Sequence, residues 1–329
     1  MKKIIILILL IVLITLLLPF TIVSISERTK AEPRLKIAEK QKEKAEDKMV
    51  LVYIKDENRV EEMEMSQYLK EVISAEMPAD FHIEALKAQA VAARTYLINR
   101  MNAYKTTEKP EYHMGADICT DSTHCKAWIR EEKRRQLWGN KAEENWQKIS
   151  RAVDETAGVI ITYEEEPISA VFHSTSSGMT ENAEDVWGGN VPYLKSIKSE
   201  GDKVSPKYSS EYSFLVDEYK RLISEKVSGV NWELGLYSDI SRSEAGGIIS
   251  LKVGGVTIKG TEFRSIFGLR STNVLINCDG DVVNMTAKGY GHGVGMSQYG
   301  ANFYANQGMG YEEILKTYYS GVEVGIHEI

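Results

Sequence analysis

The sequence predicts an α+β fold, because strand-like and helical segments mix along the chain without regular βαβ alternation. From residue 49 onward, short runs rich in β-branched residues stand beside longer runs with apolar residues at helical spacing. The hydrophobic content of 43% is ordinary for a globular protein, and 329 residues allow one large domain or two lobes around a cleft. We expect a single mixed domain over residues 49–329. The net charge of −7 argues against nucleic acid as a partner.

The N-terminus predicts a membrane anchor. Two lysines precede an apolar stretch from Ile4 to Val23, which only one proline and two threonines interrupt. This stretch is long enough to cross a bilayer core, and no small-x-small cleavage site closes it. We therefore expect an uncleaved anchor over residues 1–25, with a cleaved signal peptide as the alternative. We expect a protein that crosses the cell membrane once. The lysines place its N-terminus in the cytoplasm and the rest of the chain outside the cell. Residues 26–48 are mostly charged and are interpreted as a stalk.

Residues 68–97 predict two helices that are broken at Met77-Pro78. Proline disfavours helical geometry in the residue before it, so the first helix should end near Met77. Asp80 is the expected cap of the second helix, in which alanines recur at helical spacing.

Glu76 is the carboxylate that this break singles out. It lies in the last turn of the first predicted helix, where the helix dipole and apolar neighbours both favour the protonated form. A carboxyl group that keeps its proton near neutral pH can act as a general acid. A surface glutamate in a tight turn is the alternative. Glu71 is expected on the helix surface, and Glu84 belongs to the next helix.

A cluster of possible metal ligands follows, in the pattern H-x5-C-x4-H-C formed by His113, Cys119, His124 and Cys125. Such ligands suit tetrahedral zinc, and a full set of four leaves no position for water, so we expect a structural ion. Outside the cell membrane, a disulfide between Cys119 and Cys125 is the alternative. Cys278 is expected to be a buried free thiol.

The other elements are predicted from local patterns. A strand is expected before the two helices, at Val50–Ile54, and a loop after them, at 104–110. A helix at 142–157 should follow, and then three strands at 159–163, 168–173 and 194–199. A further helix is expected at 213–227. Gly254-Gly255 predicts a hairpin turn within residues 251–260. A short helix, a strand and two closing helices complete the chain: 260–267, 282–287, 297–306 and 311–319.

Four segments, in order, resemble the stage II sporulation protein D family. They are AEMPADFHIEALKAQAVAARTY at 75–96, ICTDSTHC at 118–125, FHSTSSGMTENAEDVWGGNVP at 172–192 and GYGHGVGMSQYGA at 289–301. Together they span roughly residues 50–319. The resemblance implies a membrane-anchored lytic transglycosylase. Such an enzyme cleaves peptidoglycan glycan strands between N-acetylmuramic acid and N-acetylglucosamine and leaves 1,6-anhydro ends.

The resemblance also implies a substrate, partners and a metal. The substrate is glycan without stem peptides, cleaved while the forespore is engulfed. The partners are the peptide-removing amidase, stage II sporulation protein P, and a further membrane protein, stage II sporulation protein M. A structural zinc at the His/Cys cluster is favoured over a disulfide. Because the same family includes amidase enhancer proteins, a non-catalytic activator of a cell-wall amidase is the alternative function.

The resemblance places Glu76 at the position of the family's catalytic glutamate. Most glycosidases need two carboxylates. A transglycosylase can use one, because the 6-hydroxyl of the sugar itself attacks the anomeric carbon. Glu76 would then be the acid and afterwards the base. Asp202 is the candidate for a second carboxylate.

Further residues are expected around the substrate. Arg94, in an alanine-rich stretch, needs an anionic partner, which is either a structural carboxylate or the substrate. The resemblance places Tyr193, Lys195 and Asp202 near the cleft, where Lys195 would hold a carboxylate or an acetamido group and Asp202 would orient the sugar or Lys195.

Two polar segments complete the predicted site. His173 and Ser177 belong to a run that lacks the G-x-S-x-G of serine hydrolases and suits sugar hydroxyls instead. Residues 289–300 lack the Lys-Ser/Thr pair of a phosphate-binding loop, and their alternating glycines allow close approach to another chain or a ligand. This loop offers His292 and Gln298 to a glycan.

Overall fold

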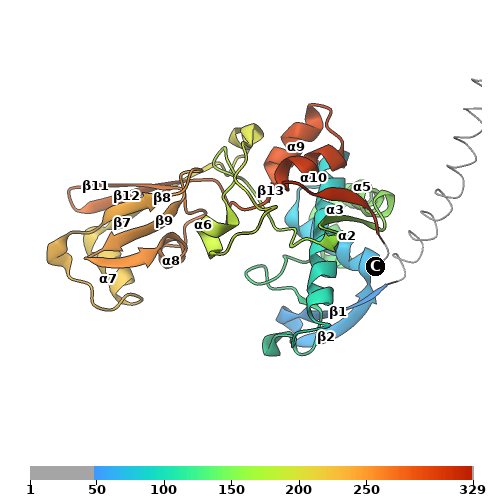
Figure 1. Cartoon of the computed structure of the whole chain (residues 1–329), viewed down its shortest axis with the longest axis horizontal. Coiled ribbons are helices and arrows are strands. Elements are labelled where there is room, and N and C mark those ends of the chain that lie inside the picture. The colour runs from blue at the N-terminus through green and yellow to red at the C-terminus, as the bar shows by residue number, and fades with distance from the viewer. Residues whose placement is uncertain (1–47, 328–329) are drawn as a thin grey trace, which may run out of the picture.

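The computed structural model describes residues 48–327, which form two lobes with separate hydrophobic cores (Figure 1). Helices and strands mix in the element order, which confirms the predicted α+β class. The predicted anchor and all of the predicted stalk except Lys48 lie outside the described residues. Within residues 48–327, no helix is both long and apolar enough to cross a membrane.

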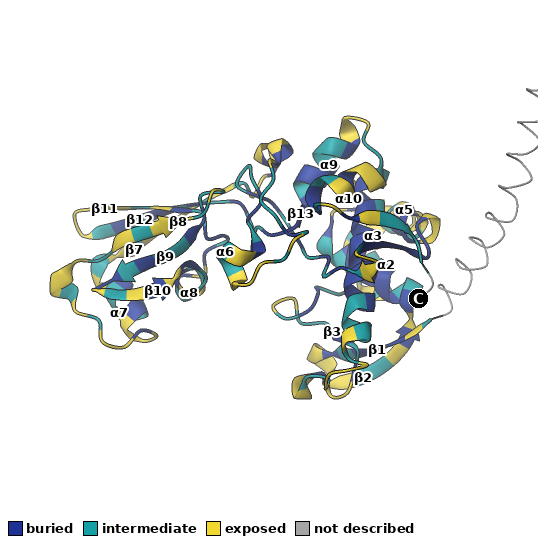
Figure 2. Ribbon diagram, viewed as in Figure 1, coloured by how far each residue is buried: buried dark blue, intermediate teal, exposed yellow. Residues whose placement is uncertain are grey.

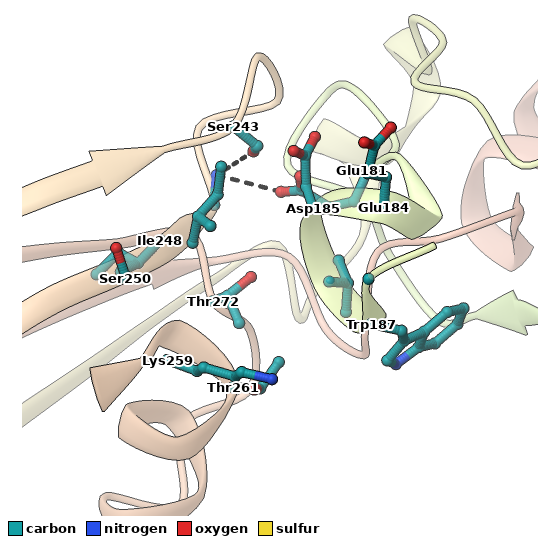
Figure 3. A pocket seen from close by; sticks show the side chains of 14 residues that line it. Glu181, Glu184, Asp185, Trp187, Ser243, Ile248, Ser250, Lys259, Thr261 and Thr272 are labelled. Carbon is teal, nitrogen blue, oxygen red and sulfur yellow. Dashed lines mark hydrogen bonds between the residues drawn. The ribbon is translucent and has the colours of Figure 1, made fainter. Parts of the chain in front are cut away.

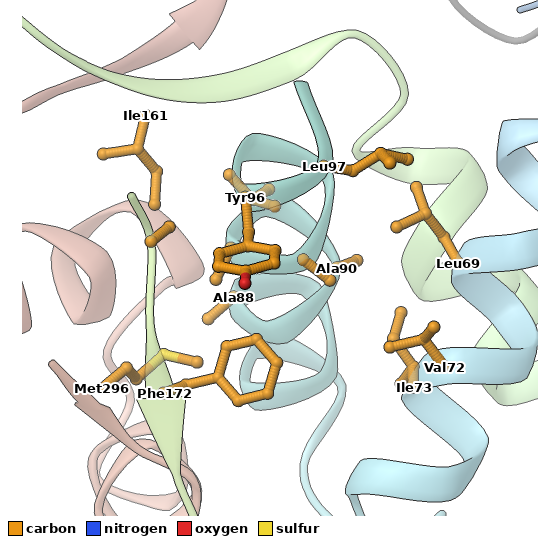
Figure 4. Close-up of a cluster of buried hydrophobic side chains, with 14 of the residues drawn as sticks. Leu69, Val72, Ile73, Ala88, Ala90, Tyr96, Leu97, Ile161, Phe172 and Met296 are labelled. Carbon is orange, nitrogen blue, oxygen red and sulfur yellow. The ribbon is translucent and has the colours of Figure 1, made fainter. Parts of the chain in front are cut away.

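The larger lobe is built around one buried helix, α3 (Ile83–Ala103). Its residues from Ala85 to Ile98 are nearly all buried, because small and apolar side chains occur on every face. Helices of the same lobe pack around it: α2 (Met65–Glu76), α5 (Ala142–Glu155), α9 (Gln298–Asn306) and α10 (Tyr311–Tyr318). Figure 4 shows how Leu69 and Ile73 of α2 face α3, with Phe172 and Met296 on its other side.

Short strands complete the larger lobe. β1 (Met49–Ile54) pairs antiparallel with β2 (Arg59–Glu64) and parallel with β3 (Ile118–Cys119). β4 (Val159–Tyr163) lies between β5 (Glu166–Pro167) and β14 (Glu323–Ile326). β6 (Phe172–His173) pairs in parallel with β13 (Met296–Ser297), and this short pairing joins two of the segments that carry predicted site residues. α4 (Glu131–Trp138) packs on α5.

The smaller lobe is inserted between the two halves of the larger lobe. Its core spans residues 219–287, whereas the core of the larger lobe draws on residues 50–194 and 294–322. One sheet has the order β11-β12-β7 and the other β10-β9-β8. The strands are β7 (Ser209–Leu215), β8 (Ser238–Arg242), β9 (Ile248–Val253), β10 (Val256–Lys259), β11 (Val274–Asp279) and β12 (Val282–Lys288).

Aromatic packing holds the smaller lobe together. α7 (Val216–Ser224) and α8 (Gly260–Ile266) bring Tyr219 and Phe263 to Phe267, and the rings of Tyr219 and Phe267 stack with centroids 5.0 Å apart. Between the lobes lies the short helix α6 (Ala183–Trp187), whose surface is largely exposed or half-buried (Figure 2).

Several predicted elements are confirmed, and others are wrong. α2 ends at Glu76 as Pro78 predicts, and the hairpin turn joins β9 to β10. α8, β12, α9 and α10 are present where expected. The cap of α3 is His82 and not Asp80, since the His82 Nδ1 accepts a hydrogen bond from the Glu84 amide.

The other corrections arise from long-range pairing and packing. The predicted helix at 213–227 begins as strand, because Ser213 pairs with Asn284 of β12. Residues 194–199 form no strand, only a bridge between Lys198 and Met179, and the strand predicted at 168–173 is reduced to β6. Glu71 is buried and not on the surface, and Cys278 is exposed and not buried.

Candidate functional site

A cavity of 870 Å³ lies between the two lobes, and its wall brings together residues that are distant in the sequence. The larger lobe contributes the end of α2, residues 122–127 and residues 171–174, and α6 contributes Trp187. The smaller lobe contributes Arg264, with Lys207 and Tyr290 from the connections to it. Of the predicted substrate-contacting residues, His173, His292 and Gln298 line this cavity together with Glu76.

Glu76 is held at the cavity wall by two hydrogen bonds. Its Oε1 accepts the amide N–H of Ala127 at 3.0 Å, and its Oε2 accepts the Gln298 Nε2–H at 3.4 Å. Met77 leaves the helix in an extended conformation, so α2 stops with Glu76 as its last residue, half-buried at the cavity. The carboxyl group is therefore fixed by partners 51 and 222 residues away in the sequence.

The cavity wall contains a single carboxylate. Among the described residues that line it, Glu76 is the only aspartate or glutamate, whereas Lys126, Lys207 and Arg264 are cations. A catalytic pair of carboxylates of the kind that hydrolysing glycosidases use is not present among these lining residues.

Asp202 lies in the interior and not on the cavity wall. It is fully buried and accepts hydrogen bonds from the Ser176 amide at 2.9 Å, from the Ser176 hydroxyl at 2.7 Å and from the Ser297 hydroxyl. Ser297 in turn caps α9, of which Gln298 is the first residue. Asp202 thus holds in place the helix start that supplies a hydrogen bond to Glu76.

His173 and His292 are neutral groups at the cavity. The His173 Nδ1 lies 3.1 Å from the Val294 carbonyl, so Nδ1 carries the proton. Its Nε2 is buried without a hydrogen-bond partner among the described residues. The His292 Nδ1 accepts the Val294 amide at 3.1 Å. Burial lowers the pKa of His173 and holds the pKa of His292 well below its usual range. Both rings can therefore exchange hydrogen bonds with a neutral ligand.

The glycine-rich loop approaches the 171–177 segment as its pattern predicts. Gly291 has φ +118°, and a Cβ there would lie 2.7 Å from the Cβ of His173. Tyr290 and Thr175 also form a bridge between the two segments. A side chain at position 291 would push the loop away from His173.

Lys126 is a cavity residue that the sequence analysis missed. It is 7% exposed, and its Nζ lies 3.7 Å from the centroid of the Phe172 ring and 4.1 Å from that of Tyr96. Burial lowers the pKa of Lys126 to about 8, although the charge of Glu76 opposes this. A lysine between a predicted metal ligand, Cys125, and an alanine carries no sequence signal, and only the fold brings it to the cavity.

Arg94 is placed in the interior of the larger lobe. Its guanidinium donates hydrogen bonds to the carbonyls of Thr156 at 2.8 Å, Val153 at 3.2 Å and Val159 at 3.3 Å. Carbonyls at the end of a helix have no partner within the helix, and Arg94 supplies one at the end of α5. Arg94 is not among the residues that line the cavity.

Tyr193, Lys195 and Ser177 also lie outside the cavity wall. The Tyr193 hydroxyl accepts the Ser169 amide at 3.1 Å, and the Lys195 Nζ donates to Asn190 at 2.5 Å. The Ser177 hydroxyl donates to the Ala245 carbonyl at 3.1 Å and so ties the larger lobe to the smaller one. Contact of these three residues with substrate stays a prediction.

The four predicted metal ligands converge. One donor atom from each of His113, Cys119, His124 and Cys125 lies within 4.8 Å of the others. Neighbouring donors are 3.1 to 3.5 Å apart. A zinc ion at its usual bond lengths places tetrahedral ligands roughly 3.3–3.8 Å apart, so the cluster can hold a metal ion. Cys119 and Cys125 are not joined by a disulfide.

The surroundings of the cluster also suit a metal. The Tyr112 hydroxyl contacts the Nε2 of His124, the ring nitrogen that faces away from the other donors. The pKa of Cys125 is lowered to about 7, first by the hydrogen bond from Cys119, and burial lowers the pKa of His113. A thiolate and a neutral imidazole are the forms that bind metal.

Comparison with known proteins places this architecture in a family. A family profile described as "Stage II sporulation protein" matches residues 53–163. Stage II sporulation protein D of Bacillus amyloliquefaciens is 38% identical over 275 residues, covering 84% of this chain and 78% of that protein. The chain belongs to the stage II sporulation protein D family. The protein of the same name from Bacillus subtilis (strain 168) is 37% identical over 281 residues, 85% of this chain and 80% of that protein.

The family match includes Glu76, Lys126 and all four residues of the His/Cys cluster. The amidase enhancer of Bacillus subtilis (strain 168) is also similar, 29% identical over 309 residues, which cover 77% of this chain and 39% of that protein. Stage II sporulation protein D relatives therefore match over most of their length, and the amidase enhancer over a smaller share.

A second cavity of 290 Å³ adjoins the first, between α6 and the smaller lobe (Figure 3). Trp187 lines both cavities and lies with its ring centroid 5.1 Å from that of His292. Glu181 faces the second cavity: its Oε1 accepts the Gly247 amide at 3.1 Å, and its buried Oε2 has no partner among the described residues. Burial raises the pKa of Glu181.

Proposed function

We propose that this chain is a peptidoglycan lytic transglycosylase that cleaves glycan strands between N-acetylmuramic acid and N-acetylglucosamine. Support comes from the isolation of Glu76, the only carboxylate among the lining residues of an 870 Å³ cavity. A hydrolytic glycosidase needs a second carboxylate, about 5–9.5 Å away, as nucleophile or base. With one carboxylate, the attacking group must come from the substrate.

The reaction then takes place in two proton transfers. Glu76 gives its proton to the glycosidic oxygen as the bond to the anomeric carbon breaks. The resulting carboxylate accepts the proton of the 6-hydroxyl of the same muramic acid as that oxygen bonds to the anomeric carbon. The products are a 1,6-anhydro end and a free hydroxyl on the departing sugar, and Glu76 regains its proton. The Ala127 amide and the Gln298 amide group hold the carboxyl in place for both steps.

The cavity wall suits an uncharged sugar backbone. The unpartnered Nε2 of His173 can accept a hydrogen bond from a sugar hydroxyl. Trp187 is 49% exposed between the two cavities and offers a flat apolar face to a sugar ring. A strand longer than the first cavity would continue past Trp187 into the second.

The family assignment supplies the biological setting of the proposal. We propose that the substrate is peptide-stripped glycan during engulfment of the forespore. Stage II sporulation proteins P and M would be the partners. The predicted anchor would hold the domain outside the cell membrane. Zinc is the proposed ion of the His/Cys cluster, where four protein ligands would cross-link the loop without an open position for water.

A non-catalytic activator of a cell-wall amidase is the second candidate, because the chain is similar to the amidase enhancer of Bacillus subtilis. Replacement of Glu76 by glutamine distinguishes the two, since it removes the titratable proton and preserves the size. The full chain in detergent should lose glycan cleavage about 100-fold or more, as expected for an essential acid–base group. Glu132→Gln on the exposed face of α4 is the control. Cleavage within a few-fold of wild type would favour the activator.

A further inference from the structure

Lys126 is a buried cation without an anionic partner among the described residues. Within residues 48–327, Lys126 forms no salt bridge with a carboxylate, and its Nζ contacts the rings of Phe172 and Tyr96 at the cavity wall. Lysines are rarely this buried unless they are paired, because loss of hydration disfavours the ammonium group. The two aromatic faces offset part of that loss. The arrangement therefore leaves Lys126 ready for an anion that enters the cavity.

The charged side chains that line the cavity are mostly positive. Lys207 and Arg264 line it beside Lys126, against the single carboxylate of Glu76. The protein as a whole carries a net charge of −7, so a cationic cavity is a local feature and not a consequence of composition. Cavities lined by one sign of charge concentrate ligands of the opposite sign.

Lys126 is also adjacent to the proposed acid. The amide of the next residue, Ala127, donates the 3.0 Å hydrogen bond to Glu76, so both groups belong to the same wall of the cavity. We therefore expect an anion that contacts Lys126 to belong to the sugar whose bond Glu76 protonates, or to a group attached directly to it.

A glycan strand offers one such anion. N-acetylglucosamine is uncharged, but N-acetylmuramic acid carries a lactyl ether on the ring that holds the cleaved bond. While a stem peptide is attached, the lactyl group ends in a neutral amide. After an amidase removes the peptide, it ends in a carboxylate. Removal of the stem peptide by the amidase therefore creates the carboxylate that a cation can bind.

We propose that Lys126 binds the free lactyl carboxylate of the muramic acid at the cleavage site, and so makes this enzyme selective for strands whose stem peptides have been removed. The inference rests on the proposed glycan-cleaving function. Lys126 contacts the substrate next to the bond that breaks, and Glu76 performs the proton transfer. Lys207 and Arg264 line the same cavity, where their charges would attract an anionic strand in general, but neither is adjacent to the acid in the sequence or through its hydrogen bonds.

The test compares two strands that differ only at the lactyl group. One is peptide-stripped glycan, and the other is the same material with its carboxylates converted to methylamides. The wild-type full chain in detergent should cleave the carboxylate strand with a kcat/KM about 10- to 100-fold higher, the effect expected of one hydrogen bond to a charged group. Lys126→Met, which keeps an unbranched apolar stem between the two rings, should bring the ratio of the two kcat/KM values close to one. Lys126→Arg should retain the preference.

A matched variant and a binding measurement complete the design. Lys207→Met removes a cation from the same cavity and weakens only the general attraction of anionic strands, so it should reduce the preference for the carboxylate strand far less than Lys126→Met does. Titration of Glu76→Gln with each strand gives the same comparison as dissociation constants, independent of turnover. Equal use of both strands by the wild type would overturn the inference, as would a preference for the carboxylate strand that persists in Lys126→Met. If neither strand is cleaved but the carboxylate strand binds preferentially through Lys126, the proposed catalysis fails, and only the recognition of the lactyl carboxylate by Lys126 stands.

Discussion

Removal of metal from the His/Cys cluster should slow catalysis by releasing Glu76, and not by removing a reactive ion. His124 and Cys125 supply two of the four converging donors, and Lys126 and Ala127 follow directly in the chain. The Ala127 amide is the donor at 3.0 Å from the Oε1 of Glu76. An ion that ties His124 and Cys125 to His113 and Cys119 therefore also fixes the donor that positions the acid.

The expected magnitude follows from that one hydrogen bond. A hydrogen bond to a charged group contributes about 1.5–3 kcal/mol. If its loss falls on the transition state, kcat decreases by about 10- to 100-fold. Stability should fall as well, because the binding energy of a structural metal contributes to folding. A loss of about 2 kcal/mol would lower the melting temperature by roughly 4–8 °C.

The assay measures metal content, melting temperature and kcat on peptide-stripped glycan for the same preparations. We expect about one zinc per chain as purified, and slower, less stable protein after chelation or in Cys125→Ser. Replacement of zinc by cobalt or cadmium should leave kcat within a few-fold, because four protein ligands leave no position for a reacting water. Cys278→Ser, at an exposed thiol of β11, is the matched control. A native kcat in metal-free protein would refute this reasoning. So would a kcat that differs strongly between the zinc, cobalt and cadmium forms.

Three further predictions concern stability and strand length. Arg94→Met should lower the melting temperature by about 6–12 °C, a loss of about 3 kcal/mol, because it removes the donor to two carbonyls at the end of α5 and to one at the start of β4; unchanged melting with lost activity would instead assign Arg94 to the substrate. Burial raises the pKa of Glu181, so its contribution to stability is fully present below its unfolded pKa and is lost as the pH rises through the folded value. Glu181→Gln should therefore melt higher than wild type at pH 7, with the difference shrinking towards pH 4, and a lower melting temperature at pH 7 would contradict this. Trp187→Ala should reduce kcat/KM on long strands more than on short oligosaccharides, because Trp187 borders both cavities; an equal reduction would place the strand elsewhere.

Local chemistry accounts for what the sequence predicted well. Pro78 ends α2 at Glu76 through sterics that involve only neighbouring residues, and Gly254-Gly255 specifies a hairpin turn for the same reason. The His/Cys cluster converges because its members are close in the sequence. The glycines near His173 were correctly interpreted as points of close approach.

Long-range contacts account for the errors. Ser213 has a helical sequence context, but pairing with β12 draws it into a strand. The sequence context of Glu71 is typical of a surface residue. In the fold its Oε1 accepts a hydrogen bond from the amide of Glu131, 60 residues away, and the side chain is buried. Asp202 was expected at the cleft, but serines from two distant segments enclose it, whereas Lys126 lines the cavity although its sequence context did not predict this. No local pattern carries this information.

The mass of the new glycan ends tests the central proposal most directly. Purified peptide-stripped strands are incubated with the full chain in detergent, and the products are weighed by mass spectrometry beside those of Glu76→Gln. If the substrate's own hydroxyl attacks, as the isolation of Glu76 predicts, each new muramic acid end is lighter than a reducing end by one water, and the variant yields none. Product ends that contain the water would contradict the account, because hydrolysis requires a second group to activate that water.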